Sequence, residues 1–340
     1  MAVQVQAADS GESCAASPGY RIPDPRRVLQ LILGAIWLLD GVLQFQSFMF
    51  TPAFGRMLAG AARGNPAVIA DPITWAARII EQHAVPANAA FATIQLLIGL
   101  GIACRPAIRA ALAASVAWSL AVWWFGEGLG GVIGANASPV SGAPGAVILY
   151  ALLAVLIWPS RDGPAGNQAA PGRSVRPGFV AAHPVGPATA RALWLILWGS
   201  LAYFAVTAAN RTAEGLPDLL AGMADGEPGW LGAVNRGAAE LLGHHGLAAS
   251  IVLAALLAVV ATAVLLPAPL HRAAVVLAIV VSVLIWIAGQ DLGELFTGSA
   301  TDPNSGPLLV LLALAYWPLT GTSHMPGPDP PSAPAQEPPS

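Results

Sequence analysis

Charged residues are scarce in this chain: they make up 10% of its 340 residues, where soluble domains carry ~25%. Lysine is absent, and all 15 basic residues are arginine, a bias typical of high-GC bacterial genomes. The net charge of −3 provides no basic excess for nucleic acid, which we exclude as a partner. With 56% hydrophobic residues and a mean hydropathy of +0.65, the composition predicts an integral membrane protein.

Cysteine and the common catalytic motifs are equally scarce. Cys14 lies in a polar segment and Cys104 in an apolar run, which excludes a disulfide framework and CxxC redox or zinc chemistry. The sequence contains no GxxxxGK[ST], GxSxG or HExxH. Residues 1–20 are polar and lack the basic-then-apolar order of a cleavable signal. We therefore predict no enzymatic activity, no metal site and no resident cofactor, with quinone or haem binding as open alternatives.

Apolar segments of near-membrane length recur along the chain. Each should form a helix, because lipid cannot satisfy an unpaired backbone. The predicted fold is an all-α, polytopic transmembrane bundle of eight spans. These spans are expected at 28–48, 87–104, 108–125, 144–158, 192–209, 247–266, 271–288 and 307–319.

Polar and Pro/Gly-rich stretches divide the chain. Residues 160–190 are rich in glycine and proline, which predicts a flexible linker between two halves. The predicted domains are a polar N-terminal segment 1–26, a first membrane repeat 27–159, the linker 160–190, a second membrane repeat 191–320 and a disordered Pro-rich tail 321–340.

The arginines predict the orientation. With the N-terminus inside, the inner segments carry ten arginines and the outer loops five. The positive-inside rule then places both termini in the cytoplasm, with the spans in a bacterial cytoplasmic (inner) membrane.

The two halves resemble each other when the sequence is shifted by 163 residues. This shift pairs a motif at the outer end of the third span in each half, and it also pairs Arg109 with Arg272. Agreement at tryptophan, glycine and arginine is much less easily explained by chance than agreement at alanine or leucine. We predict a duplicated four-helix unit whose copies have the same orientation. The motif residues are Trp123, Gly126 and Gly130 in the first half and Trp286, Gly289 and Gly293 in the second.

Two segments suggest a known family. Residues 94–118 contain the end of an apolar helix, closed by Leu-Gly-x-x-x-x-Arg at Arg105, and a second arginine at Arg109. This pattern resembles the turn between the second and third helices of DoxX-like membrane proteins. Residues 26–45, with Gly34 and the pair Asp40-Gly41, are similar to the first helix of that family. The resemblance implies a four-helix membrane unit, and some members of the family are associated with quinone-linked sulfur oxidation.

Four polar residues are candidates for lining a cavity. Asp40 lies about twelve residues into the first apolar run, with Gln44 one turn later, and an ionisable residue at membrane depth marks a functional site. The alternative is that Asp40 reaches interfacial water or pairs with Arg56. Glu127 and Gln290 occupy equivalent positions and could face each other between the halves around one ion or proton. Alternatively they end helices at the headgroups, with the motif tryptophans as interface anchors.

Other polar residues admit two interpretations. A set of four near the last span, Asp291, Glu294, Asp302 and Asn304, could offer oxygen atoms to a hard cation, but its spacing matches no calcium loop. We interpret it as turn chemistry, with Asp302 or Ser305 capping the last helix. The interfacial histidines that leave haem ligation open are His83, His244 and His245.

The favoured function is a non-catalytic membrane component, or an accessory subunit of a redox or envelope system. Its expected partners are the lipid bilayer and another membrane protein. One alternative is a small-solute or ion transporter or channel with a cavity between the two repeats. Another is a quinone- or haem-binding oxidoreductase subunit.

Overall fold

The computed structural model describes residues 24–134, 137–159 and 178–319, and this part of the chain is helical, without strands. The tail predicted at 321–340, most of the N-terminal segment and linker residues 160–177 lie outside it. Residues 178–190, which we had assigned to the linker, include a short helix and the first turn of a long one.

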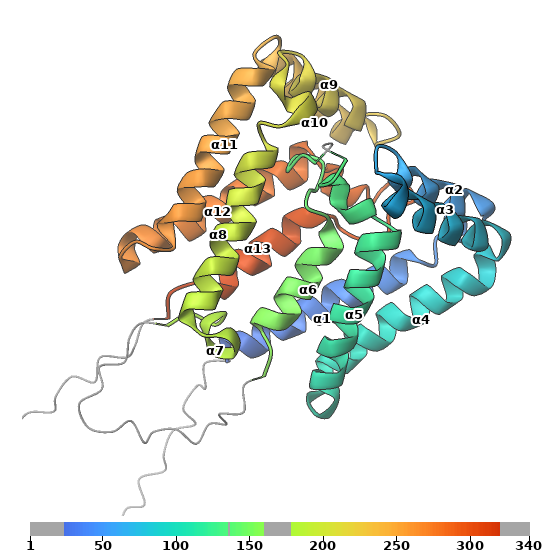
Figure 1. Cartoon of the computed structure of the whole chain (residues 1–340), viewed down its shortest axis with the longest axis horizontal. Helices are drawn as coiled ribbons and strands as arrows, with labels where there is room; N and C mark the ends of the chain where they lie inside the picture. The colour runs from blue at the N-terminus through green and yellow to red at the C-terminus, as the bar shows by residue number, and fades with distance from the viewer. Residues whose placement is uncertain (1–23, 135–136, 160–177, 320–340) are drawn as a thin grey trace, which may run out of the picture.

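In the first half, α1 packs on α4, α4 on α5, and α5 on α6, while α2 and α3 pack on each other near one end of the bundle (Figure 1). The six helices are α1 Pro25–Leu43, α2 Pro52–Ala59, α3 Ala67–Gln82, α4 Ala84–Ala103, α5 Ile108–Phe125 and α6 Ala146–Leu156.

The second half has the same order of long, short and surface helices after α7. Here α8 packs on α11, α11 on α12, and α12 on α13, while α9 and α10 pack on each other. The two halves meet where α6 packs against α13 (Figure 1). The seven helices are α7 Ala182–Val185, α8 Pro187–Phe204, α9 Gly215–Met223, α10 Gly229–Leu242, α11 Gly246–Ala263, α12 Ala268–Ala288 and α13 Ser305–Ala315.

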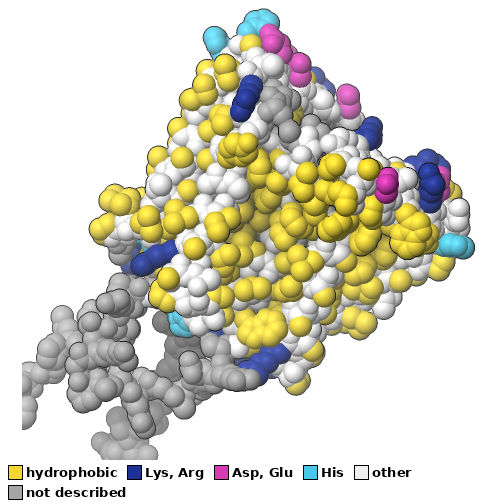
Figure 2. Space-filling model, viewed as in Figure 1, with side chains coloured by type: hydrophobic (Ala, Val, Ile, Leu, Met, Phe, Trp, Pro, Cys, Tyr) yellow, Lys and Arg dark blue, Asp and Glu magenta, His cyan; other side chains and the backbone are white. Residues whose placement is uncertain are grey.

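Four described helices are long and apolar enough to cross a membrane, at Ala84–Ala103, Arg105–Phe125, Gly246–Ala263 and Pro269–Ala288. The helices α6 and α13 are apolar but have 11 residues each. At ~1.5 Å per residue they extend ~16 Å, about half of a ~30 Å bilayer core. Most of their residues are buried, so they lie inside the protein. Figure 2 shows a face in which apolar side chains predominate and charged ones lie near the edges.

Glycine allows α1 and α4 to approach closely. A Cβ atom at Gly99 of α4 would lie 2.7 Å from Leu38 Cγ and 2.8 Å from the carbonyl oxygen of Gly34, both in α1. One turn further along, a Cβ atom at Gly41 would lie 2.7 Å from Leu96 Cγ. Small residues at helix crossings bring the two backbones together and increase their van der Waals contact.

This crossing predicts an unequal effect of two similar substitutions. Gly99→Ala should lower the free energy of unfolding by about 1–3 kcal/mol, because the added methyl group overlaps α1. Gly199→Ala in α8 is the matched control, since nothing lies within 4 Å of its Cβ position. Thermal unfolding in one detergent would measure both variants. Equal losses would contradict the close crossing of α1 and α4.

Candidate ligand cavity and the loops that build it

After α5 and after α12 the chain leaves the helix, and each motif tryptophan binds the loop that follows. Trp123 Nε1 donates a hydrogen bond of 2.7 Å to the carbonyl oxygen of Pro144, and Trp286 Nε1 donates one of 2.8 Å to that of Pro303. These indole N–H groups are therefore used inside the protein and are not available to lipid headgroups. Their role is to fix each loop against the start of the next helix.

The motif glycines are needed for the same loops. Gly130 has φ +63°, and a Cβ atom there would overlap the carbonyl oxygen of Pro144. Gly293 has φ +79°, and its Cβ would lie 2.5 Å from the carbonyl carbon of Pro303. Both positions thus combine a left-handed backbone with a close backbone contact, which glycine alone accommodates without strain.

Glu127 and Gln290 tie these loops to the following helices. Glu127 Oε1 accepts a hydrogen bond of 3.2 Å from the backbone N–H of Val147, and Gln290 Oε1 accepts one of 3.0 Å from that of Gly306. Gln290 Nε2 also donates to Ser305 Oγ at 2.8 Å. Each side chain therefore satisfies a backbone N–H in the first turn of a short helix.

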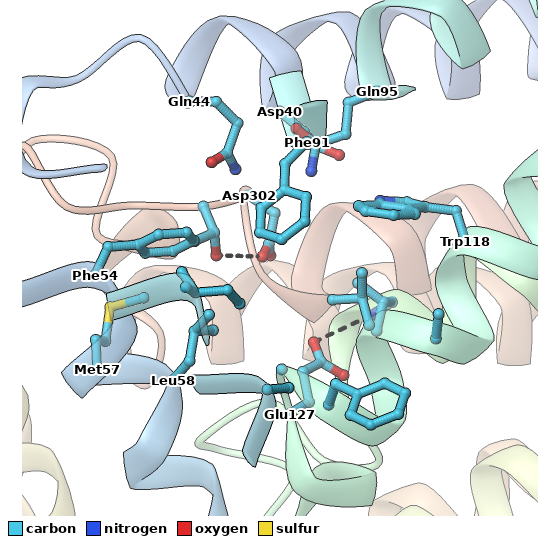
Figure 3. Close-up of a pocket in the computed structure, with 18 of the residues that line it drawn as sticks. Asp40, Gln44, Phe54, Met57, Leu58, Phe91, Gln95, Trp118, Glu127 and Asp302 are labelled. Atoms are coloured by element: carbon cyan, nitrogen blue, oxygen red, sulfur yellow. Dashed lines mark hydrogen bonds between the residues drawn. The ribbon is translucent and has the colours of Figure 1, made fainter. Parts of the chain in front are cut away.

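A cavity of about 370 Å³ lies within the first half, beneath α2 and α3. Asp40, Gln44 and Glu127 line it, as does Asp302 from the loop before α13 (Figure 3). Gln290 is not among the residues that line this cavity, and its amide group binds Ser305 and Gly306 at the start of α13. This cavity thus lies inside the first half and is completed by a second-half loop, and the cavity expected between the halves stays a prediction.

Aromatic rings supply much of the remaining wall. Each of the helices α1 to α5 contributes at least one ring. The rings belong to Trp37, Phe54, Trp75, Phe91, Trp118 and Phe125. Three lining residues are also exposed on the molecular surface, at 39%, 65% and 40% for Met57, Trp75 and Phe125. The cavity therefore lies directly beneath the surface that α2, α3 and the end of α5 form.

The three carboxyl groups are held differently. Asp40 is 2% exposed, and its Oδ2 accepts a hydrogen bond of 2.6 Å from the hydroxyl group of Tyr150 in α6. The sequence offered Arg56 as an alternative partner of Asp40. Arg56 instead pairs with Glu81 at 3.0 Å on the surface, so the predicted pair of Asp40 and Arg56 is wrong. Asp302 accepts hydrogen bonds of 2.8 Å from both Thr301 Oγ1 and the Asn304 backbone N–H.

The sequence placed Asp302 in a turn but missed its place in the cavity. The turn is present, and the residue that caps α13 is Asn304, whose Oδ1 accepts from the Ser305 N–H at 2.6 Å. No local signal identifies Asp302 as a cavity residue, because its neighbours in the cavity lie far away in the sequence. The one feature of the sequence that could have indicated its role is that the carboxyl group of Asp302 lies between two strongly apolar segments.

Several buried polar atoms of lining residues have no hydrogen-bond partner. The acceptors are Asp40 Oδ1, Gln44 Oε1, Gln95 Oε1 and Glu127 Oε2, and the donor is Trp118 Nε1. Buried polar groups are nearly always hydrogen-bonded, so a cluster of such atoms indicates where water or a bound molecule completes the structure. Acceptors predominate in this cluster, which favours a molecule that donates hydrogen bonds.

The charge in the cavity is not balanced by basic residues. Among the described lining residues there is no arginine and no histidine. Burial raises the pKa of Glu127 to about 8, and the nearby Asp302 carboxylate adds to the rise, against the N–H groups of Val147 and Ala146. Burial also raises the pKa of Asp302, against the hydrogen bonds from Thr301 and Asn304. Near neutral pH the Glu127 carboxyl group is therefore mostly protonated.

Asp291 and Glu294, in the loop after α12, have different surroundings. Asp291 is fully buried and its Oδ1 accepts a hydrogen bond from Asn235 Nδ2, while Glu294 is exposed. Both have positive φ angles, of 48° and 55°, where the first-half loop has Gly128 and Gly131. Within the described residues, no group of three or more His, Cys, Asp or Glu side chains is placed to hold a metal ion.

No family model matches this chain, and no curated protein or solved structure is significantly similar to it.

The raised pKa of Glu127 predicts how stability depends on pH. The folded state holds a proton on Glu127 between its usual value of 4.5 and about 8, where the unfolded chain has released it. This contribution to stability is complete below pH 4.5 and is lost as the pH rises through that window. The melting temperature of the wild type should therefore fall from pH 5 to pH 8.

Two variants isolate the Glu127 contribution. Glu127→Gln keeps the acceptor for Val147 but cannot ionise, so its melting temperature should fall less over the same pH range. Asp71→Asn removes an exposed carboxyl group of α3 and should keep the wild-type slope. A Glu127→Gln variant with the full wild-type slope would show that Glu127 does not titrate in this window.

Proposed function

We propose that this chain is an integral membrane transport protein that binds a small solute in the first-half cavity. The observation that carries the proposal is a cavity of about 370 Å³ with polar groups set in an aromatic wall. Ligand sites typically measure ~300–1,000 Å³ and combine apolar walls with a few polar groups. Ionisable groups placed among membrane-spanning helices are typical of solute and proton pathways.

We further propose that the membrane part is a duplicated, parallel four-helix unit with eight spans, as in the DoxX-like resemblance. The equivalent bonds of Trp123 and Trp286, and the equal lengths of α6 and α13, support this arrangement. In this arrangement α1 and α8 are two further spans, and α6 and α13 become spans together with the non-helical loops that precede them. Cytoplasmic termini in a bacterial inner membrane remain part of the proposal.

Two residues of the cavity wall have apolar counterparts in the other half. The shift of 163 that pairs the motif tryptophans places Val281 opposite Trp118. The shift of 159 that pairs Pro144 with Pro303 places Ala143 opposite Asp302. Val140 of the first-half loop packs with Leu216 and Leu220 of the second half into a hydrophobic cluster. These replacements support one solute site per chain, in the first half.

Haem binding is less well supported. No histidine is among the described lining residues, so the cavity does not support haem ligation.

The binding site can be tested by filling it. Ala121 of α5 lines the cavity, so Ala121→Phe should occupy its volume while leaving every polar group in place. Ala117→Phe, one turn earlier on an exposed position, is the matched control. Small molecules that bind at 100 times their Kd stabilise the folded state by ~2.7 kcal/mol, which a thermal-shift screen detects.

We expect compounds that stabilise the wild type and Ala117→Phe to leave Ala121→Phe unchanged. Equal stabilisation of all three proteins would place the binding site elsewhere, and no hit in a broad library would remove support for a ligand site. Uptake of a hit into proteoliposomes then tests transport. A hit that binds in the cavity and is not carried across the bilayer would contradict the transport part of the proposal.

A further inference from the structure

Resting on the proposed solute site, we propose that the solute is an organic ammonium ion with an apolar body. We propose that it binds in exchange for a proton held by the cavity carboxyl groups.

The first argument is the sign of the charge. Asp40, Glu127 and Asp302 line one cavity, and no basic side chain lies among the described lining residues. The ion pairs of the described chain, Arg56–Glu81 and His244–Glu214, lie at exposed sites elsewhere. An anion would meet three acidic groups and no basic one, and a purely apolar molecule would bury carboxyl groups without a partner. A cation avoids both problems, because it is attracted to the acidic groups and gives the buried carboxyl groups a partner.

The second argument is the chemistry of the wall. Aromatic rings attract cations through their negative faces, by ~0.5–2 kcal/mol for each favourable contact. The unpartnered acceptors Gln44 Oε1 and Gln95 Oε1 call for a donor, as does Glu127 Oε2 once its proton has left, and an ammonium group carries several N–H donors. The rings also accommodate an apolar body, which a metal ion or ammonia lacks.

The third argument locates the ammonium group. Asp40 is almost completely buried, and its Oδ2 is already bound to Tyr150. Glu127 and Asp302 are half-buried, and both contribute to the cavity surface. We therefore place the ammonium group between Glu127 and Asp302, with the apolar body against the rings of Phe54, Phe91 and Trp118 (Figure 3).

Proton exchange follows from this placement. The titratable groups that face Glu127 are Asp302 from the loop before α13, Asp40 from α1 and Tyr150 from α6. The helices α2 to α5 contribute no titratable side chain to the cavity wall. Because the pKa of Glu127 is raised to about 8, its carboxyl group is protonated when the cavity is empty. An arriving cation favours the carboxylate, so the O–H bond releases its proton to water and the net charge stays unchanged.

The test compares three probes of similar shape, 2-phenylethylammonium, 2-phenylethanol and phenylacetate, with the full chain in lipid nanodiscs. Calorimetric titration at pH 7.5 should show the ammonium binding at least tenfold more tightly than the alcohol, and the acetate most weakly. Between pH 6 and pH 7.5 the ammonium affinity should rise by up to about tenfold per pH unit, since one proton is displaced. The alcohol should bind independently of pH.

Variants assign the proton. Glu127→Gln should flatten the pH dependence of ammonium binding, while Glu240→Gln at an exposed position of α10 should keep the wild-type pH dependence. Titrating the wild type in two buffers of different ionisation enthalpy counts released protons without any variant. We expect close to one per ammonium bound near pH 7.

The outcomes separate this inference from the proposed function. If ammonium and alcohol bind equally, with no proton release, the ammonium inference is overturned and the solute site stands. Tighter binding of phenylacetate would also overturn the inference and leave the site in place. If no probe binds while the library screen finds cavity ligands, the solute class is wrong. If neither the three probes nor the library screen yields a ligand, the ammonium inference and the proposed function both fail.

Discussion

The architecture of this protein depends on two hydrogen bonds from indole N–H groups to proline carbonyl groups. Trp123 binds Pro144 and Trp286 binds Pro303, at 2.7 and 2.8 Å, and each bond holds a non-helical segment inside an apolar molecule. Non-helical backbone is tolerated in such surroundings where other protein groups satisfy it. Once these loops are fixed, α6 and α13 begin at defined residues and pack against each other at the centre. The same fixed loops carry Glu127 and Asp302 to the cavity.

The cavity concentrates groups that weaken an apolar protein. Buried carboxyl groups without a cationic partner cost free energy, and so do acceptors without donors. Asp40 is partly compensated by Tyr150, and Glu127 by the N–H of Val147, but Asp40 Oδ1 and Glu127 Oε2 have no partner. A local departure from stable packing is expected at functional sites, where a ligand supplies the missing interactions.

The sequence allowed much of the helical framework to be predicted. Every expected apolar segment contains a helix, because lipid and core both require satisfied backbone groups. Asp40, Gln44 and Glu127 were found as polar exceptions in apolar surroundings, and they line one cavity. Gln290, at the equivalent position of the second half, is not among the residues that line this cavity. A glutamine both donates and accepts, so its amide group is consumed by Ser305 and Gly306. Asp302 was missed because its neighbours lie more than a hundred residues away, which local patterns cannot reveal.

The origin of Asp302 has a consequence for biosynthesis. The rest of the cavity wall is complete once Val147 has been made, whereas Thr301 and Asp302 follow about 155 residues later in the sequence. At ~5–20 residues per second, the ribosome needs roughly 8 to 30 s to synthesise the intervening chain. During that interval the first half would reside in the bilayer with an open polar cleft, a natural place for water, lipid or an insertion factor to occupy. The loop before α13 would close this cleft only at the end of synthesis, so truncated chains should expose the cleft to cellular quality control.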